Sequence, residues 1–375
     1  MIKVLKKVLI SFVFLSVAVI GFSQTAKELY FQGVNSYNFQ NYTDAIEYFT
    51  KAIQLVPDNA HSYNNRGMAK EMLRDYSGAI TDYSISIVLN PKDTSAYINR
   101  GNAKCQVRDF RGGIEDFNIA IKLDSNNPKT YYNRGTAKSD LNDLLEAVKD
   151  YDTAIKLDPE YSMAYTNRAN AKADLQDYKG AVDDYNKALT LDPDDATTYF
   201  NMGNAKYFLQ DYTGAIYDYT KAINIHPEYG EAYCNRGLTY YEKKEYKAAI
   251  LDFNKSIEID PTNAIAYSSR GNALSDLKDN KGAILDFSKA IELYPNFIEA
   301  YYNRASVFDE LKEFKKSISD YSKVLEIDPN DAASYYRRGL AKIELKLTID
   351  GCHDLSKAKN LGLQEAEKAF MKYCY

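Results

Sequence analysis

Asparagine side chains recur at a fixed interval and are the first candidates in this chain for a chemical role. A side-chain amide has two hydrogen-bond donors and an acceptor, so a regular row of amides can hold the backbone of an extended polypeptide whatever its side chains are. The alternative is that these amides only satisfy neighbouring polar groups of the fold. The seven residues share one 34-residue register, which is interrupted at Ser269 and ends at Arg337: Asn65, Asn99, Asn133, Asn167, Asn201, Asn235 and Asn303.

Aromatic side chains near the same register would add contact area at a low cost in entropy. Those that we assign to the binding surface are Tyr132, Phe200, Tyr207 and Tyr241, accompanied by Tyr37, Phe208 and Tyr302. Acids nearby would favour a partner that contains Lys or Arg: Asp140, Asp174, Glu242, Asp276 and Glu310. We therefore expect the surface to bind an extended, weakly basic protein segment. The alternative ligand is a carbohydrate, stacked on the tyrosines and hydrogen-bonded by the amides.

Residues suited to catalysis or metal binding do not gather in the sequence. The only histidines, His61, His226 and His353, are far apart, and none has a Cys, Asp or Glu at a recurring metal-ligand spacing. There is no glycine-rich phosphate loop after a strand and no serine in a strand-turn-helix setting. The sequence predicts a protein that is not an enzyme, with no cofactor and no metal.

Proline reveals the period to which these residues belong. Eight of the nine prolines fall on one 34-residue grid with a single empty place at Ser125: Pro57, Pro91, Pro159, Pro193, Pro227, Pro261, Pro295 and Pro329. We number each period from 1 to 34, beginning at Ala26, so that these prolines have position 32 and the seven asparagines position 6. A period of this size is typical of a stacked array of repeats, which offers a long surface and no deep central core.

Within each period the residues predict a helix, a turn and a second helix. Position 8 is Gly or Ala, position 20 is Gly, Ala or Ser, and position 4 is Tyr in every repeat but the first. Small residues that face each other let two helices approach closely, and we expect the position 4 ring to fill the space beside them. A polar break such as Arg74-Asp75 marks the turn. Positions 2, 6, 9 and 13 then share one face of the first helix.

At these positions the chain resembles the tetratricopeptide repeat family, and ten repeats fit without insertion over residues 26–365. The resemblance implies an all-α fold, a right-handed α-solenoid or superhelix of tandem helix-turn-helix repeats, whose concave groove is lined by positions 2, 6, 9 and 13. We expect residues 364–375 to form a C-terminal capping helix. Departures from the pattern are Ser125 at a proline position and Leu347–Asp350 at the last turn.

The asparagine row is similar to the one that binds peptide backbone in the repeat region of O-linked N-acetylglucosamine transferases. The chaperone-type carboxylate clamp is not matched, because its lysine at position 5 is replaced by Tyr30, Asn64, Ile98, Tyr132, Thr166 and Phe200. A C-terminal carboxylate is therefore not the expected ligand.

A second pattern pairs charges. Position 7 is Arg in eight repeats and position 23 is Asp in nine, and the first repeat has neither, with Gln32 and Tyr48 instead. This joint absence favours pairs within each repeat, a scheme that fails only at Met202 and Asp218. A guanidinium can hold a carboxylate by two bonds and stack on tyrosine. We predict a structural role, with an anion-binding site as the alternative.

Residues 1–23 have the layout of a secretory signal peptide. Three lysines precede the apolar run Val8–Ile20, and small residues suit cleavage before Gln24. This run is short for a span of the roughly 30 Å hydrocarbon core. The sequence predicts a bacterial protein that is periplasmic, in the cell envelope or secreted, without membrane insertion after cleavage. Removal of the three lysines leaves a net charge of −8, so nucleic acid is not an expected partner.

Two of the four cysteines are placed to form a disulfide. Cys352 and Cys374 lie 10 and 12 residues from Gly362, where we expect a turn between antiparallel helices. Their sulfurs should therefore meet and tie down the capping helix, and two buried thiols are the alternative. Cys105 and Cys234 lie in different repeats, too far apart in a solenoid to pair.

Overall fold

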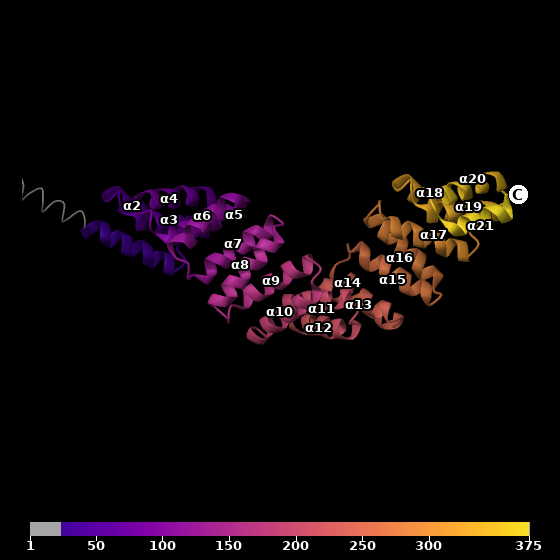
Figure 1. Ribbon diagram of the computed structural model, residues 1–375, viewed down its shortest axis with the longest axis horizontal. Helices are drawn as coiled ribbons and strands as arrows, with labels where there is room; N and C mark the ends of the chain where they lie inside the picture. The colour runs from indigo at the N-terminus through magenta and orange to yellow at the C-terminus, as the bar shows by residue number, and fades with distance from the viewer. Residues whose placement is uncertain (1–23, 375) are drawn as a thin grey trace, which may run out of the picture. The chain divides into compact units, whose positions relative to one another are not determined.

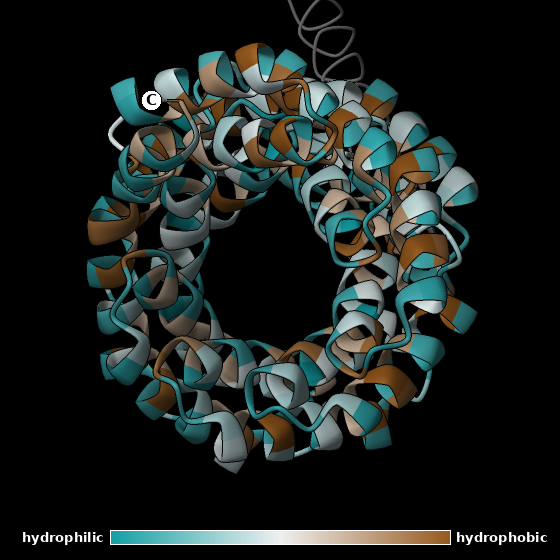
Figure 2. Ribbon diagram, turned by 90° about the vertical axis from the view of Figure 1, so that its right-hand side faces the viewer, coloured by the Kyte–Doolittle hydropathy of each residue, from teal (hydrophilic) through white to brown (hydrophobic). Residues whose placement is uncertain are grey.

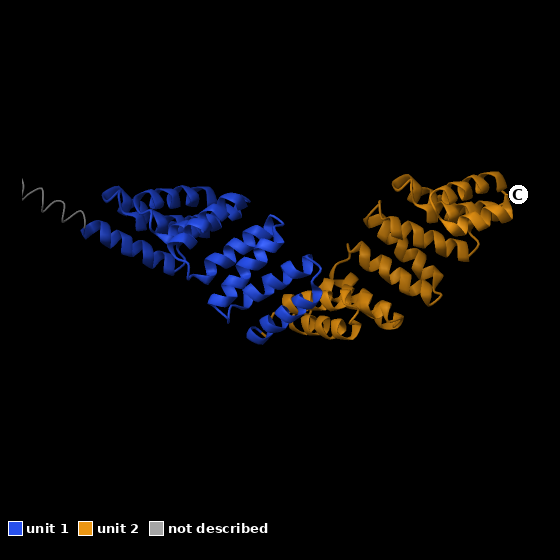
Figure 3. Ribbon diagram, viewed as in Figure 1, with its two compact units in different colours: residues 1–192 blue, residues 193–375 orange. Residues whose placement is uncertain are grey.

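The computed structural model describes residues 24–374, so the predicted signal peptide lies outside the described residues. The chain divides into two compact units, residues 1–192 and 193–375 (Figure 3). Within residues 24–374 all regular structure is helical, and Figure 1 labels the helices in chain order. None of these helices is both long and apolar enough to cross a membrane.

The helices follow the 34-residue period in both units. Unit 1 begins with a helix over residues 24–38. It continues with α2 (Tyr42–Leu55), α3 (Ala60–Met72), α4 (Tyr76–Leu89), α5 (Thr94–Gln106), α6 (Phe110–Leu123), α7 (Pro128–Asp140), α8 (Leu144–Leu157), α9 (Ser162–Asp174) and α10 (Tyr178–Leu191). Unit 2 contains α11 (Ala196–Phe208), α12 (Tyr212–Ile225), α13 (Gly230–Glu242), α14 (Tyr246–Ile259), α15 (Ala264–Asp276), α16 (Asn280–Leu293), α17 (Ile298–Glu310), α18 (Phe314–Ile327), α19 (Ala332–Glu344), α20 (Thr348–Asn360) and α21 (Gln364–Tyr373).

Inside each unit every helix packs on the next one along the chain, so helix pairs stack consecutively. This confirms the predicted all-α solenoid of helix-turn-helix repeats. Hydrophobic and hydrophilic residues alternate along the helices (Figure 2), as expected where one face of each helix packs on its neighbours.

Small residues bring the two helices of a repeat together. A Cβ atom added to Gly67 at position 8 would lie only 2.7 Å from the ring of Tyr83 at position 24. In repeat 3 a Cβ on Gly113 at position 20 would lie 3.0 Å from the carbonyl oxygen of Gly101. Positions 8 and 20 therefore face each other as predicted. The ring beside position 8 comes from position 24, so the assignment of this role to position 4 was wrong.

The turn inside each repeat contains a left-handed residue that the residue types do not predict. Position 15 has a positive φ in all ten repeats, from 59° to 66°, although none of these residues is glycine. This left-handed residue ends the first helix and lets the second begin two residues later. The last repeat keeps the same turn, with Lys346 at φ 63°, despite its unusual sequence.

Aspartate at position 16 caps the second helix where position 19 is glycine. The Asp109 carboxylate accepts a hydrogen bond from the Gly112 backbone N–H, 3.0 Å away, and a Cβ on Gly112 would lie 2.2 Å from that carboxylate. In repeat 4, where Glu146 replaces the glycine, Asp143 makes no such bond. The cap therefore needs both residues.

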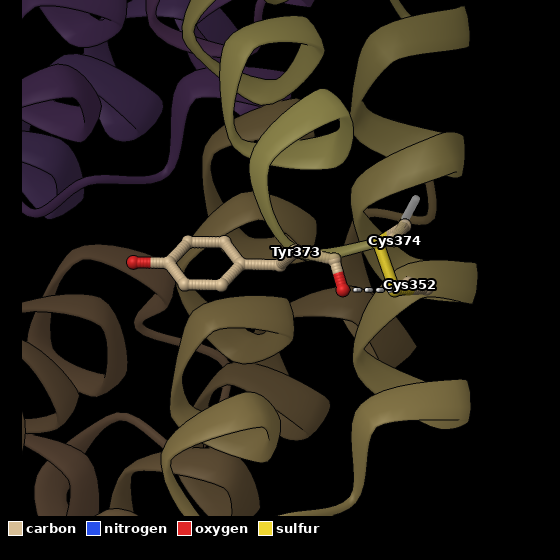
Figure 4. The surroundings of a disulfide bond; sticks show 3 residues. All are labelled: Cys352, Tyr373 and Cys374. Atoms are coloured by element: carbon tan, nitrogen blue, oxygen red, sulfur yellow. Dashed lines mark hydrogen bonds between the residues drawn. A yellow bond between two sulfur atoms is a disulfide. The ribbon is translucent and has the colours of Figure 1, made fainter.

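The C-terminal helix is tied to the last repeat by a disulfide. Cys352 in α20 and Cys374 after α21 are bonded, with their Cα atoms 5.7 Å apart (Figure 4). This confirms the predicted pairing. Because the bond closes a loop of 22 residues, its expected contribution is about 3 kcal/mol. Cys105 and Cys234 are free thiols.

Candidate functional site

The arginine at position 7 joins the two helices of each repeat. In repeat 3, Nε and Nη2 of Arg100 donate to the two oxygens of Asp116 at 2.9 and 2.6 Å. The same two-bond pair recurs in eight repeats, always within one repeat, which confirms the predicted pairing. The guanidinium also lies over the position 4 ring, 5.7 Å from the centre of Tyr97 in this repeat.

Two further contacts of this cluster were not foreseen. Nη1 of Arg100 donates to Ser84 at position 25 of the preceding repeat, 3.1 Å away. Nζ of Lys104 lies 2.8 Å from Asp116, which is 2% exposed. The aspartate thus has two cationic partners, and the arginine is occupied on all sides. The arrangement indicates a structural role, because it leaves no open guanidinium for an anion.

Repeat 6 breaks this pattern. Met202 replaces the arginine, and buried Asp218 has only Lys206 as a cationic partner, with 2.6 Å between Nζ and Oδ2. Neither carboxylate oxygen of Asp218 accepts a hydrogen bond of good geometry within the described residues. Burial raises the pKa of Asp218 to about 6, although Lys206 opposes the shift.

The position 6 asparagines are half-buried and bond to the preceding repeat in the same unit. Nδ2 of Asn133 donates to Oδ1 of Asn102 at 2.9 Å, and Nδ2 of Asn167 donates to the hydroxyl of Tyr132 at 3.0 Å. The acceptor lies at position 5 or position 9, whichever has a suitable side chain. The remaining pairs are Asn65 to Tyr30, Asn99 to Asn64, Asn235 to Asn204 and Asn303 to Asn272. Asn201 is also half-buried.

These bonds use only part of each amide. In Asn133 and Asn235, Oδ1 accepts no hydrogen bond within residues 24–374, and in Asn133 one amide proton also has no acceptor there. The bond that is made fixes the orientation of the amide. An acceptor on each of these two residues, and a donor on Asn133, therefore remain in a set orientation for another molecule.

Hollows of one kind recur beside these asparagines. In unit 1 a hollow of about 350 Å³ is lined by Asn102, Tyr132 and Asn133 among others, and one of about 180 Å³ by Tyr37, Asn65 and Met68 among others. In unit 2 a hollow of about 320 Å³ lies beside Tyr207 and Asn235, and one of about 100 Å³ beside Tyr241 and Asn303. Each hollow lies between the first helices of successive repeats in its own unit.

The predicted aromatic residues divide into two groups. Phe200 packs among buried residues of α12 and α13, and its ring centre lies 4.9 Å from that of Tyr229. Tyr132 likewise packs on buried residues, although it also borders a hollow. Tyr207 and Tyr241 line hollows more openly, and the Tyr241 hydroxyl donates to Asp276 of the next repeat at 2.8 Å. Phe200 and Tyr132 therefore contribute to the packing of the helices, whether or not they also contact a ligand.

Glu71, at position 12, was missed in the sequence because a single acid on a helix is usually solvated. Its carboxylate accepts a hydrogen bond from the buried Tyr83 hydroxyl at 2.8 Å and lines the larger hollow of unit 1. Burial raises the pKa of Glu71, and the tyrosine bond opposes the shift. Within residues 24–374 no group of three or more His, Cys, Asp or Glu side chains could hold a metal ion.

Family models match most of this array. Models described as Tetratricopeptide repeat match residues 33–94, 128–161, 230–263, 264–297 and 298–331, and a model described as TPR repeat matches residues 169–210 and 203–244. The chain belongs to the tetratricopeptide repeat family. A comparison with curated proteins gives no match.

Solved structures of other tetratricopeptide repeat proteins share the fold. The C-terminal part of a TPR repeat-containing protein from Cytophaga hutchinsonii is 22% identical, covering 63% of this chain and 97% of its own, with a TM-score of 0.54. A tetratricopeptide repeat protein from Parabacteroides merdae is 22% identical, covering 66% and 98%, with a TM-score of 0.51. YrrB, described as a TPR protein with an unusual peptide-binding site, is 24% identical, covering 49% and 96%, with a TM-score of 0.44. At 22% identity the likeness to the first two structures concerns the fold alone.

Proposed function

We propose that this tetratricopeptide repeat protein is a non-catalytic, exported scaffold or adaptor that binds an extended protein segment on the face of its first helices. The observation that carries the proposal is the set of oriented, partly used amides at position 6 beside the repeated hollows. Peptide groups of an extended chain offer one donor and one acceptor per residue, which is what these amides leave open.

Export is supported by the sequence of residues 1–23 and by the Cys352–Cys374 disulfide, since such bonds persist in oxidising compartments. Sequencing of the N-terminus of the protein recovered from its native cell tests this part. A first residue of Gln24 is expected, and an intact Met1 would contradict cleavage.

Binding is tested by crosslinking the mature chain in its native envelope and then comparing three variants: Asn167→Ala, the same change combined with Asn133→Ala, and Tyr132→Phe. Asn167→Ala removes an amide with its bonds to Tyr132 and Thr136, whereas Tyr132→Phe removes only the first bond and leaves the amide in place. Both should cost about 1 kcal/mol of stability. Only Asn167→Ala, combined with Asn133→Ala, should weaken capture of the partner.

Equal capture by all variants would refute the role of the amides. Binding of a carbohydrate array, with no protein captured, would favour the alternative ligand class. That alternative has fewer rings to use than the tyrosine content suggests, because the position 4 rings are covered by guanidinium groups and the position 24 rings are buried, which leaves rings such as Tyr207 and Tyr241 beside the hollows.

A further inference from the structure

The hollow in unit 2 beside Tyr207 has apolar walls. It is lined by Asn204, Tyr207 and Phe208 of α11, Tyr219 of α12, and Asn235 and Leu238 of α13. Phe208 is 61% exposed and adds apolar surface at the edge of the hollow. The ring centres of Tyr207 and Phe208 lie 5.8 Å apart in an edge arrangement, so they form one corner of the hollow.

The polar atoms at the base of this hollow already have partners. Oδ1 of Asn204 accepts from the Tyr219 hydroxyl at 2.8 Å and from Nδ2 of Asn235 at 2.9 Å. Both acceptor sites of that oxygen are therefore used. An apolar group could therefore cover the Asn204 oxygen without leaving it buried and unpaired. The free-energy cost of burying an unpaired polar atom would not arise at this oxygen.

The corresponding hollow in unit 1 has a different chemistry. At positions 12 and 13 it has Cys105 and Gln106 in place of Tyr207 and Phe208, and at position 9 of its second helix pair it has Thr136 in place of Leu238. The unit 1 hollow is also lined by the carboxylates of Glu71 and Asp140, whereas no acidic residue lines the unit 2 hollow. The difference indicates that side chains at positions 9, 12 and 13, together with the neighbouring acids, determine what each hollow accepts.

A negative charge borders the apolar hollow. Burial raises the pKa of Tyr207, and the charge of Glu242, at position 13 of the next repeat, raises it further. Glu242 is the last residue of α13 and follows Leu238 by four residues, so it lies on the same face of the helix one turn beyond the hollow, and it is exposed to solvent. A cationic group held next to the apolar occupant would complement this charge.

We infer that the Tyr207–Leu238 hollow selects a bulky aliphatic or aromatic side chain of the bound protein segment, adjacent to a Lys or Arg that faces Glu242. This inference rests on the proposed function and adds side-chain selectivity to the backbone recognition by the amides. Asn235 stands at the edge of the same hollow and bonds the peptide group next to the inserted side chain.

The test is a selection of random 12-residue peptides displayed on phage by the mature chain. The selected peptides should contain Phe, Tyr, Trp, Leu, Ile or Met next to Lys or Arg. Their affinity is then measured for Leu238→Asn combined with Phe208→Gln, residue types that the chain itself has at these positions in Asn272 and Gln106. Because a large apolar side chain loses its burial, binding should weaken about 10- to 100-fold.

Leu340→Asn is the matched control, since it changes position 9 in the last repeat, away from this hollow. Its affinity should equal that of the unchanged protein, and helicity should be the same in all variants. Selected peptides that bind the double variant as well as the unchanged protein would overturn the inference and leave the proposed function standing. Failure to select any peptide would count against both.

Discussion

Replacement of Met202 by Arg should stabilise unit 2, and the gain should depend on pH. In the unchanged protein burial raises the pKa of Asp218 from 3.8 to about 6. Since one pKa unit corresponds to about 1.4 kcal/mol, the ionised carboxylate lowers the free energy of unfolding by about 3 kcal/mol at pH 7. An arginine at position 7 would supply the two hydrogen bonds seen in Arg236 and Asp252, at 2.8 Å each.

The sign of the pH dependence follows from the raised pKa. As the pH rises from about 4 to about 6, the unfolded chain releases the proton of Asp218 before the folded chain does, so stability falls over this interval and stays lower above it. Met202→Arg should lower the pKa of Asp218 in the folded state and so remove this loss of stability. The variant should therefore gain about 1–3 kcal/mol at pH 7 and much less at pH 4.

Hydrogen exchange of α11 and α12, followed by mass spectrometry between pH 4 and 8 and corrected for intrinsic exchange rates, measures this locally. A local readout is needed because long repeat arrays do not unfold in one step. Asp218→Asn is the companion variant: it removes the buried charge and should abolish the pH dependence without loss of stability at pH 7. Equal protection of Met202→Arg and the unchanged protein at pH 7 would refute the reasoning.

Three further outcomes are expected. Asp116→Asn should destabilise repeat 3 by about 3 kcal/mol, because it leaves Arg100 and a lysine without their carboxylate; unchanged melting would contradict the pairing. Asp109→Ala should cost about 1 kcal/mol through loss of a helix cap, while Asp143→Ala, where no cap bond exists, should cost almost nothing in the same denaturation assay. Cys374→Ser should increase amide hydrogen exchange in α21 with little effect on the first repeats. In the unchanged protein, denatured but not reduced, thiol counting should find two reactive thiols rather than four.

The period, the helix pairs and the Arg–Asp pairs could be predicted because each depends on residues that recur at a fixed spacing. The joint absence of Arg and Asp from the first repeat was enough to assign the pairs to single repeats. Lys104 was missed as a second partner of Asp116 because a lysine on a helix usually extends into solvent. The turn at position 15 was placed correctly, but its left-handed backbone was hidden by residues such as Arg74 and Lys278, which rarely adopt it.

The candidate site was less accessible to sequence reasoning. Asn133 and Asn167 have the same position but bond to acceptors at positions 9 and 5, and the choice depends on which neighbour can accept. Phe200 was assigned to the binding surface by spacing, and the structure adds contacts with buried residues of α12 and α13 that spacing did not indicate. Such contacts join residues of successive repeats, and a pattern within one period does not contain them.

The bond between Cys352 and Cys374 has a consequence for how the stack comes apart. A linear array is most easily peeled from its ends, where each unit has a single neighbour to hold it. The disulfide holds α21 on α20, so unfolding is less able to begin at this end of the array. Under non-reducing conditions, unfolding should therefore begin at the first repeats and proceed toward the last. A reductant that breaks the disulfide should allow unfolding to begin at the C-terminal helix as well.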